Sequence, residues 1–164
     1  RDVLAKRKEE DNAPYDIWVE RGLITLSEGS QNDFSLVTAW FIKMIQEHGI
    51  RPLWVGFDPW NSLYWVKEME EAGFTLEKVR QGIFSLSEPM KQLEADLKSK
   101  LVNYNNNPMM KWNLANTQAK VDINGNIQPS KLGSKFKRID GAVALIIAYA
   151  VLNRYKQEYE GMSR

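Results

Sequence analysis

The stretch from Leu53 to Trp60 constrains the fold most, because it is an apolar run that stops on a carboxylate and a proline. Its first five residues are typical of a short core strand. Pro59 has no backbone N–H to give to a sheet, so the strand must end near Asp58. Open α/β sheets bind their ligands at the carboxyl ends of strands. Asp58 is therefore the first candidate functional residue.

A helix and a second strand follow this first strand. Helical spacing of apolar residues runs from Asn61 to Ala72, Gly73 is typical of a helix end, and Phe74–Gln81 is again strand-like. Strand, helix and strand within about 30 residues form a βαβ unit with parallel strands and a right-handed crossover. The sequence therefore predicts an α/β fold whose sheet is at least partly parallel.

Other segments complete the predicted fold. A buried helix is expected at its end, because residues 139–155 are apolar almost all round. No linker divides the chain, which favours one domain over residues 1–164. The remaining expectations are helices at 1–11, 33–48, from Ser85 or Ser87 to 101 and 109–116, a strand at 23–26, inward-facing Leu63, and a hairpin at 117–127 around Asn124-Gly125.

Composition excludes several kinds of chemistry. The chain has no cysteine, which rules out disulfides, thiolate metal sites and cysteine nucleophiles, and its single histidine, His48, argues against a Ser-His-Asp triad. No apolar run reaches the roughly 20 residues that a bilayer requires, so no membrane partner is expected. Residues 91–164 carry 12 basic and 6 acidic side chains. That excess is compatible with a polyanionic partner.

Asp140 is the second candidate acid. It opens the C-terminal helix directly after a polar loop that carries Lys131, Lys135, Lys137 and Arg138. Helix capping and Asp-Pro turns also favour aspartate at these two places, so both acids have a purely structural interpretation. The functional interpretation is that they converge on a divalent cation, because carboxylates suit Mg²⁺ and paired metal ions can clamp a phosphodiester during its displacement.

An ordered series of motifs resembles one protein family, the nuclease domain of the large terminase subunits of tailed phages. The resemblance implies an RNase H-like mixed sheet flanked by helices. It also implies an endonuclease that needs Mg²⁺ or Mn²⁺, held in a two-metal site of the intact domain, and that cuts concatemeric double-stranded DNA during genome packaging. The series runs through Pro14–Trp18, Gly56-Phe57-Asp58-Pro59-Trp60-Asn61, Val79-Arg80-Gln81-Gly82, Leu86–Lys91 and Arg138-Ile139-Asp140-Gly141-Ala142.

The resemblance also assigns roles to residues. Asp58 and Asp140 match two of the family's catalytic, metal-binding acids, and the cations at 131, 135, 137 and 138 would contact DNA phosphates. The family's first acid lies on an opening strand that would precede Arg1, and no phosphate loop of the G-x-x-x-x-G-K-[ST] type occurs in the chain. We therefore expect a partial domain that lacks its first strands, with Glu20, Asp33 and Asp122 as further acids to consider.

The resemblance further implies a small terminase subunit and a portal as partners of the intact parent, in the cytoplasm of a host bacterium. Two alternatives remain open. One is another RNase H-like nuclease, such as a junction resolvase. The other is a non-catalytic module that binds DNA or docks onto a portal and uses its acids only as caps.

Overall fold

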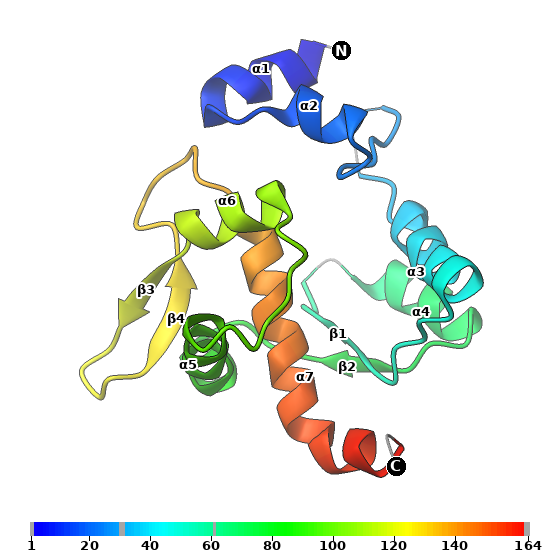
Figure 1. Ribbon diagram of the computed structural model, residues 1–164, viewed down its shortest axis with the longest axis vertical. Helices are drawn as coiled ribbons and strands as arrows, with labels where there is room; N and C mark the ends of the chain where they lie inside the picture. The colour runs from blue at the N-terminus through cyan, green and yellow to red at the C-terminus, as the bar shows by residue number, and fades with distance from the viewer. Residues whose placement is uncertain (1, 30–31, 61, 163–164) are drawn as a thin grey trace.

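A computed structural model describes residues 2–29, 32–60 and 62–162 (Figure 1). A long helix, α7, runs through the middle of the molecule, with α5 and a β-hairpin on one side and a small parallel sheet with α3 and α4 on the other. The elements are α1 (Asp2–Asp11), α2 (Tyr15–Glu20), α3 (Ser35–His48), β1 (Val55–Phe57), α4 (Leu63–Glu71), β2 (Leu76–Lys78), α5 (Ile83–Lys98), α6 (Pro108–Asn116), β3 (Gln118–Val121), β4 (Ile127–Ser130) and α7 (Asp140–Met162).

The predicted βαβ unit is confirmed. Strands β1 and β2 are parallel, with Val55 opposite Leu76, and α4 connects them. The chain turns after α4 at Gly73, whose positive φ of 86° favours a residue without a side chain. Val55, Met69 and Phe74 form a buried cluster beside the sheet, and Phe41 of α3 packs against it. The predicted start of α4, Asn61, lies outside the described residues, and Leu63 faces solvent at 82% exposure because it sits at the open end of the helix.

Helix α7 packs directly against the backbone of β1. A Cβ at Gly56 would lie 2.6 Å from Cγ2 of Ile147 and 2.7 Å from Cγ2 of Val151. On the other side of α7, Leu86 and Leu93 of α5 are buried against it. The C-terminal helix is therefore the central core element, as its apolar sequence predicts.

We expect Gly56→Ala to destabilise the domain by about 1–3 kcal/mol, because the added methyl overpacks the contact between β1 and α7. Chemical denaturation measures the change. Gly161→Ala is the matched control, since a Cβ there meets nothing within 4 Å and alanine favours a helix more than glycine does. Equal stability of the two variants would contradict the close packing at Gly56.

The hairpin of β3 and β4 rests on α5. Its strands are antiparallel and Gly125 supplies the positive φ of the turn, as predicted. Ser87 does not cap a helix, as one expectation had it, because α5 begins earlier, at Ile83. Its buried hydroxyl instead accepts a hydrogen bond of 3.0 Å from the N–H of Ile127. This bond fixes β4 to α5.

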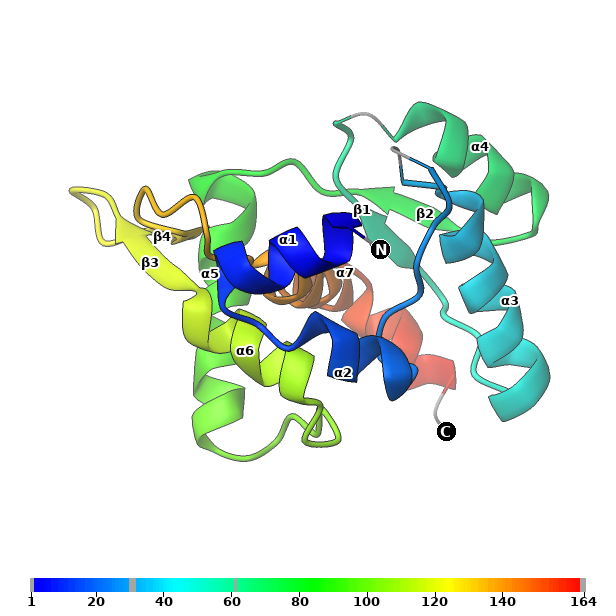
Figure 2. The ribbon, with the colours of Figure 1, turned by 90° about the horizontal axis from the view of Figure 1, so that it is seen from above.

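The N-terminal part differs from the expectation. Residues 23–26 form no strand, and the turn of chain before them is a helix, α2. The reason is tertiary, because Trp18 is buried against Trp112 of α6 at a ring distance of 5.5 Å, with Tyr15 beside both. Helices α1 and α2 lie across one end of α7 when the molecule is viewed from above (Figure 2).

Helix α3 presents less of its apolar stripe to the core than its periodicity predicts. Phe41 and Ile45 pack inward, but Phe34 and Trp40 are each 51% exposed. The N-cap residue of α3 is Phe34, and Asp33 before it accepts a hydrogen bond of 3.0 Å at Oδ1 from the N–H of Ser35. The exposed rings leave an apolar face beside the sheet.

The described strands form two separate two-stranded sheets, one parallel and one antiparallel. Within the ranges that the structure describes, no strand pairs with the outer edge of β1. None of the helices in those ranges has the length and apolar content needed to cross a bilayer.

Candidate active site

Asp58 lies where β1 ends, and two hydrogen bonds hold its carboxylate. Oδ1 accepts from the N–H of Trp60 at 3.1 Å, and Oδ2 accepts from Nε2 of Gln81 at 2.5 Å. Gln81 follows β2 as Asp58 follows β1, so the parallel pairing of the strands brings the two side chains to one edge of the sheet. The hydrogen bond from Trp60 to the Asp58 side chain forms the turn that is expected at an Asp-Pro pair. Each oxygen keeps a second lone pair for another ligand.

Asp140 is exposed at the start of α7. Among the described residues, its carboxylate has no hydrogen-bond or salt-bridge partner. The N–H of the next residue, Gly141, is capped from α6 by Oδ1 of Asn113 at 3.0 Å. Another helix therefore provides the cap that the structural interpretation assigned to Asp140, and the Asp140 carboxylate is left free.

Strand β1 and helix α7 run in opposite directions. Trp54 stacks on Tyr155 near the end of α7, Gly56 touches Ile147 in its middle, and Asp58 shares a cavity of about 300 Å³ with Ala144. Ala144 lies one turn after Asp140 on the same helix face. The antiparallel course thus directs the carboxyl end of β1, with Asp58, toward the N-terminus of α7, with Asp140.

The donor set suits a hard divalent cation that keeps several waters. Two carboxylates with free lone pairs are ligands that Mg²⁺ accepts. Across the described ranges, no group of three or more His, Cys, Asp or Glu side chains could hold a metal ion. Two-metal sites need more ligands than these two, so the residues fit one cation more readily than a pair.

None of the other acids considered, Glu20, Asp33 and Asp122, lines the cavity that contains Asp58. Asp122 closes the hairpin turn by accepting from Asn126 Nδ2 and from the N–H groups of Asn124 and Asn126. These hydrogen bonds, that from the Asn126 side chain foremost, lower the pKa of Asp122. Asp33 accepts from the N–H of Ser35 at the start of α3, and Glu20 is the last residue of α2. None of the three joins Asp58 and Asp140.

Arg138 differs from the other predicted DNA contacts. Its Nε and Nη2 each donate at 2.8 Å to the carboxylate of Asp11, whose side chain is fully buried, and the hydroxyl of Tyr15 donates to the same carboxylate at 2.7 Å. The hydrogen bond to Asp11 is the main cause of a raised pKa of Arg138. Its guanidinium therefore joins α1 to the segment before α7.

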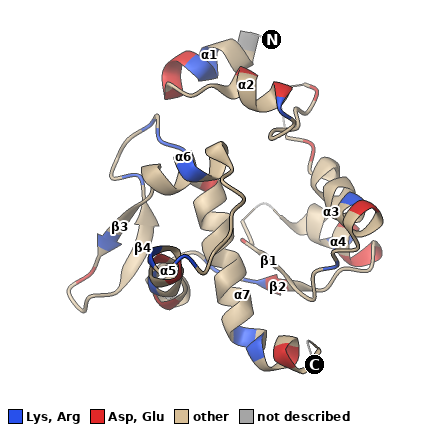
Figure 3. Ribbon diagram, in the orientation of Figure 1, with Lys and Arg blue, Asp and Glu red and all other residues tan. Residues whose placement is uncertain are grey.

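Lys131, Lys135 and Lys137 lie on the loop between β4 and α7 and are partly or largely exposed. Within the part of the chain that the structure describes, none of them forms a salt bridge. Lys and Arg also occur on β3 and α6 (Figure 3).

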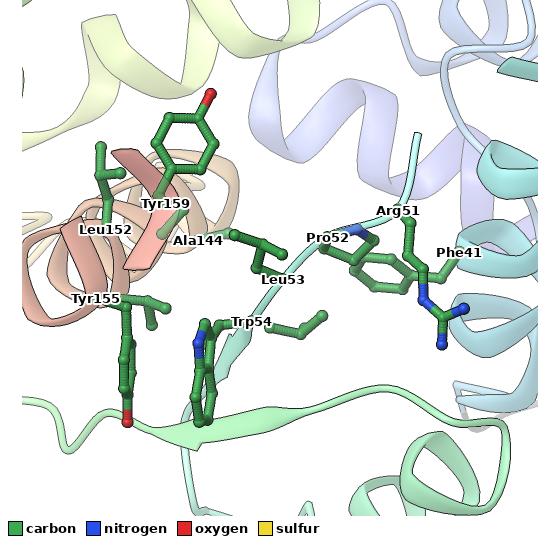
Figure 4. Close-up of a pocket in the computed structure, with 13 residues that line it drawn as sticks. Phe41, Arg51, Pro52, Leu53, Trp54, Ala144, Leu152, Tyr155 and Tyr159 are labelled. Atoms are coloured by element: carbon green, nitrogen blue, oxygen red, sulfur yellow. The ribbon is translucent and has the colours of Figure 1, made fainter. Parts of the chain in front are cut away.

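A second cavity, of about 480 Å³, lies at the other end of β1 (Figure 4). It is mainly apolar, with Leu53 and Trp54 on one side and Tyr155 and Tyr159 of α7 on the other. Both cavities include Gly56 and Ala144. The two cavities lie along the outer edge of β1, the edge that faces away from β2. The backbone groups of residues 55 and 57 bond to β2, and those of residues 54, 56 and 58 point toward the outer edge.

Sequence reasoning missed Gln81, Asn113 and Asn116 as residues of this site. A signal for Gln81 was present, because it is the last residue of the predicted second strand and Asp58 stands where the predicted first strand must end. The signal for Asn113 and Asn116 was weaker: they are three residues apart on α6, which places both on one helix face. Trp60, beside Asp58, is a rim residue at 81% exposure.

A parallel strand pair with an acid at its carboxyl end, packed against a helix that opens on a second acid, agrees with an α/β domain of the RNase H-like class, and a structural match supports that class. A solved structure, that of the HK97 bacteriophage large terminase, superposes with a TM-score of 0.80 at 26% identity, over 92% of this chain and 31% of that one. The family model for the endonuclease domain of the terminase large subunit matches residues 2–155. The chain belongs to this family.

Two relatives agree with that assignment. The chain is 29% identical to Protein YmfN of Escherichia coli strain K12 over 167 residues, 95% of this chain and 35% of that protein. It is 28% identical to the terminase large subunit of Enterobacteria phage HK97 over 161 residues, 97% of this chain and 31% of that protein. The chain therefore spans about a third of the length of the curated relatives that it matches.

Proposed function

We propose that this chain is part of a metal-dependent endonuclease that cuts concatemeric double-stranded DNA, with Asp58 and Asp140 as ligands of Mg²⁺ or Mn²⁺. One observation carries the proposal: in a member of a terminase endonuclease family, the antiparallel course of β1 and α7 directs two acids to the same end of the fold. The Asp140 carboxylate is free because Asn113 caps its helix.

The residues divide the work as follows. A cation held by the two carboxylates would polarise a phosphate oxygen and favour ionisation of a bound water. Gln81 orients the carboxylate of Asp58 through Oδ2, which leaves the remaining lone pairs for the cation. The three free lysines attract the DNA backbone without reading sequence. Arg138 supports the segment before Asp140 through its pair with Asp11.

The rest of the packaging function belongs, in this proposal, to a longer polypeptide. The relatives are about three times as long as this chain, and the outer edge of β1 offers unpaired backbone groups for a further strand. Such a strand could also bring a third acid to the site. The ATPase, the small terminase subunit, the portal and a location in the cytoplasm of the host bacterium are parts of the same proposal.

The proposal is tested by incubating the polypeptide that contains this chain with linear double-stranded DNA and with plasmid, in Mn²⁺ or in EDTA. We expect cleavage of both substrates only with the metal. Cleavage of branched DNA alone would favour a junction resolvase. DNA binding without cleavage in any divalent metal would favour a non-catalytic module.

Replacement of Lys131, Lys135 and Lys137 together by Ala should weaken DNA binding and flatten its salt dependence. Each lost phosphate contact reduces the slope of log K against log salt by about 0.9, so the triple variant should lose roughly 2–3. Fluorescence anisotropy at several salt concentrations measures the slope. The control is a triple variant of Lys43, Lys67 and Lys156, which pair with acids one turn away on their own helices. An equal change in both variants would argue against a DNA contact at the loop.

A further inference from the structure

Two amide side chains of α6 hold the backbone on both sides of Asp140. Oδ1 of Asn113 accepts from the N–H of Gly141 at 3.0 Å, and Nδ2 of Asn116 donates to the carbonyl of Arg138 at 3.2 Å. The Asp140 carboxylate, which lies between these two attachment points, makes no hydrogen bond to any described residue. The position of the carboxylate therefore depends on a backbone segment that another helix holds.

Asn113 is itself held firmly. It is 6% exposed, its Nδ2 donates to the carbonyl of Met109 at 3.0 Å, and its backbone carbonyl accepts from Oγ1 of Thr117 at 2.8 Å. Its Cγ would lie 3.3 Å from a Cβ placed on Gly141, so the two residues fit closely. The buried side-chain amide bonds to Met109 through Nδ2 and to Gly141 through Oδ1, so it has little rotational freedom and can transmit the position of α6 to the start of α7.

This arrangement differs from ordinary helix capping. An N-cap side chain usually belongs to the residue before its own helix and satisfies only local N–H groups. Here the cap of α7 comes from Asn113 of α6, which lies 27 residues before Asp140 in the sequence. The bond to the carbonyl of Arg138 adds a second point of attachment that helix capping does not require.

We propose that Asn113 and Asn116 are positioning residues that set the geometry of Asp140 toward the cation, which rests on the proposed metal role of Asp140. In metal sites, groups that orient a ligand without touching the metal commonly change affinity by 10–100-fold when removed. The α6 helix thereby becomes part of the functional site, although it supplies no ligand.

The test compares Asn113→Ala with Asn107→Ala in the full chain. Asn107 caps α6, where its Oδ1 accepts from the N–H groups of Met109 and Met110 at 2.9 and 3.2 Å. Each variant loses a buried or part-buried cap, so their melting temperatures should fall by comparable amounts. Only Asn113→Ala should weaken Mn²⁺ binding, by roughly tenfold in titration calorimetry or electron paramagnetic resonance.

A milder variant guards against unfolding. Asn116→Ala removes one hydrogen bond and should weaken Mn²⁺ binding by a smaller factor, about threefold, on the same reasoning. The proposal is overturned if Asn113→Ala binds Mn²⁺ as the unchanged protein does, or if Asn107→Ala weakens binding equally.

A readout without metal separates this inference from the proposed function. In Asn113→Ala we expect the Gly141 amide to lose its protection from hydrogen exchange and the Asp140 carboxyl ¹³C resonance to broaden or shift, with neither change in Asn107→Ala. If the unchanged protein binds no Mn²⁺, the proposed function fails, while these two NMR signals still decide whether Asn113 positions Asp140. Unaltered signals in Asn113→Ala would overturn the inference.

Discussion

Replacement of Asp58 or of Asp140 by Asn is expected to reduce metal-dependent cleavage of plasmid DNA by roughly a thousandfold or more. The change keeps the shape of the side chain and removes the negative charge that a divalent cation needs. Loss of the Lewis acid forfeits several kcal/mol of transition-state stabilisation, and each 1.36 kcal/mol is a factor of ten in rate. The measurement is initial cleavage rate in Mn²⁺ by the polypeptide that contains this chain.

The control for these two variants is Asp16→Asn. Asp16 is an exposed acid on α2 that pairs with Lys8 at 2.6 Å, and it lies outside the cavity that contains Asp58. Its replacement should leave the cleavage rate within about twofold, because exposed ion pairs contribute little. Undiminished cleavage by both Asp58→Asn and Asp140→Asn would remove the basis of the proposed metal site.

Replacement of Asp11 by Ala is expected to destabilise the domain by about 3 kcal/mol. Removing one partner of a buried ion pair leaves the other charge unpaired, and the usual cost is about 3–5 kcal/mol. The lower figure applies because the Arg138 side chain keeps 26% exposure and can recover some hydration. The hydroxyl of Tyr15 also loses its acceptor, the Asp11 carboxylate. Urea denaturation at pH 7 measures the change.

The same pair predicts a pH dependence. Burial raises the pKa of Asp11, but the hydrogen bonds from Arg138 and Tyr15 and the charge of Arg138 together lower it below the ordinary value of 3.8. Because the folded pKa is lowered, the pair stabilises the protein fully above about pH 4, and this stability is lost as the pH falls through the lowered pKa. Asp11→Asn should therefore lose most of this acid dependence. If Asp11→Asn still loses stability at low pH as the unchanged protein does, other carboxylates cause that loss.

Much of the local structure was predictable from the sequence. The βαβ unit around Asp58, the hairpin at Asn124-Gly125 and the buried C-terminal helix follow from periodicity, proline, glycine and apolar content, all of which act over a few residues. The two candidate acids were also predictable, because each stands at the end of an element whose limits are set locally. Whether they ligate a metal stays a prediction.

The misassigned elements show where local patterns stop. Leu23–Leu26 has the composition of a strand, yet no described strand lies beside it to pair with it. The residues before it form α2, where Trp18 packs against Trp112, 94 positions later. Helix α3 shows a regular apolar stripe, but Phe34 and Trp40 find no described element to cover them. Periodicity predicts the element and cannot say how much of its face is covered.

The sequence by itself determined most of the elements, the βαβ connection and the two acids, because backbone preferences and apolar spacing are properties of neighbouring residues. Only the tertiary structure decided which polar side chains hydrogen-bond to Asp58 and to the backbone and side chains that support Asp140. Gln81 reaches Asp58 across 23 positions, Asn113 reaches Gly141 across 28, and Arg138 reaches Asp11 across 127. A hydrogen bond requires two groups to meet within about 3 Å, and for residues this far apart in sequence only the packing of whole helices and strands brings them that close.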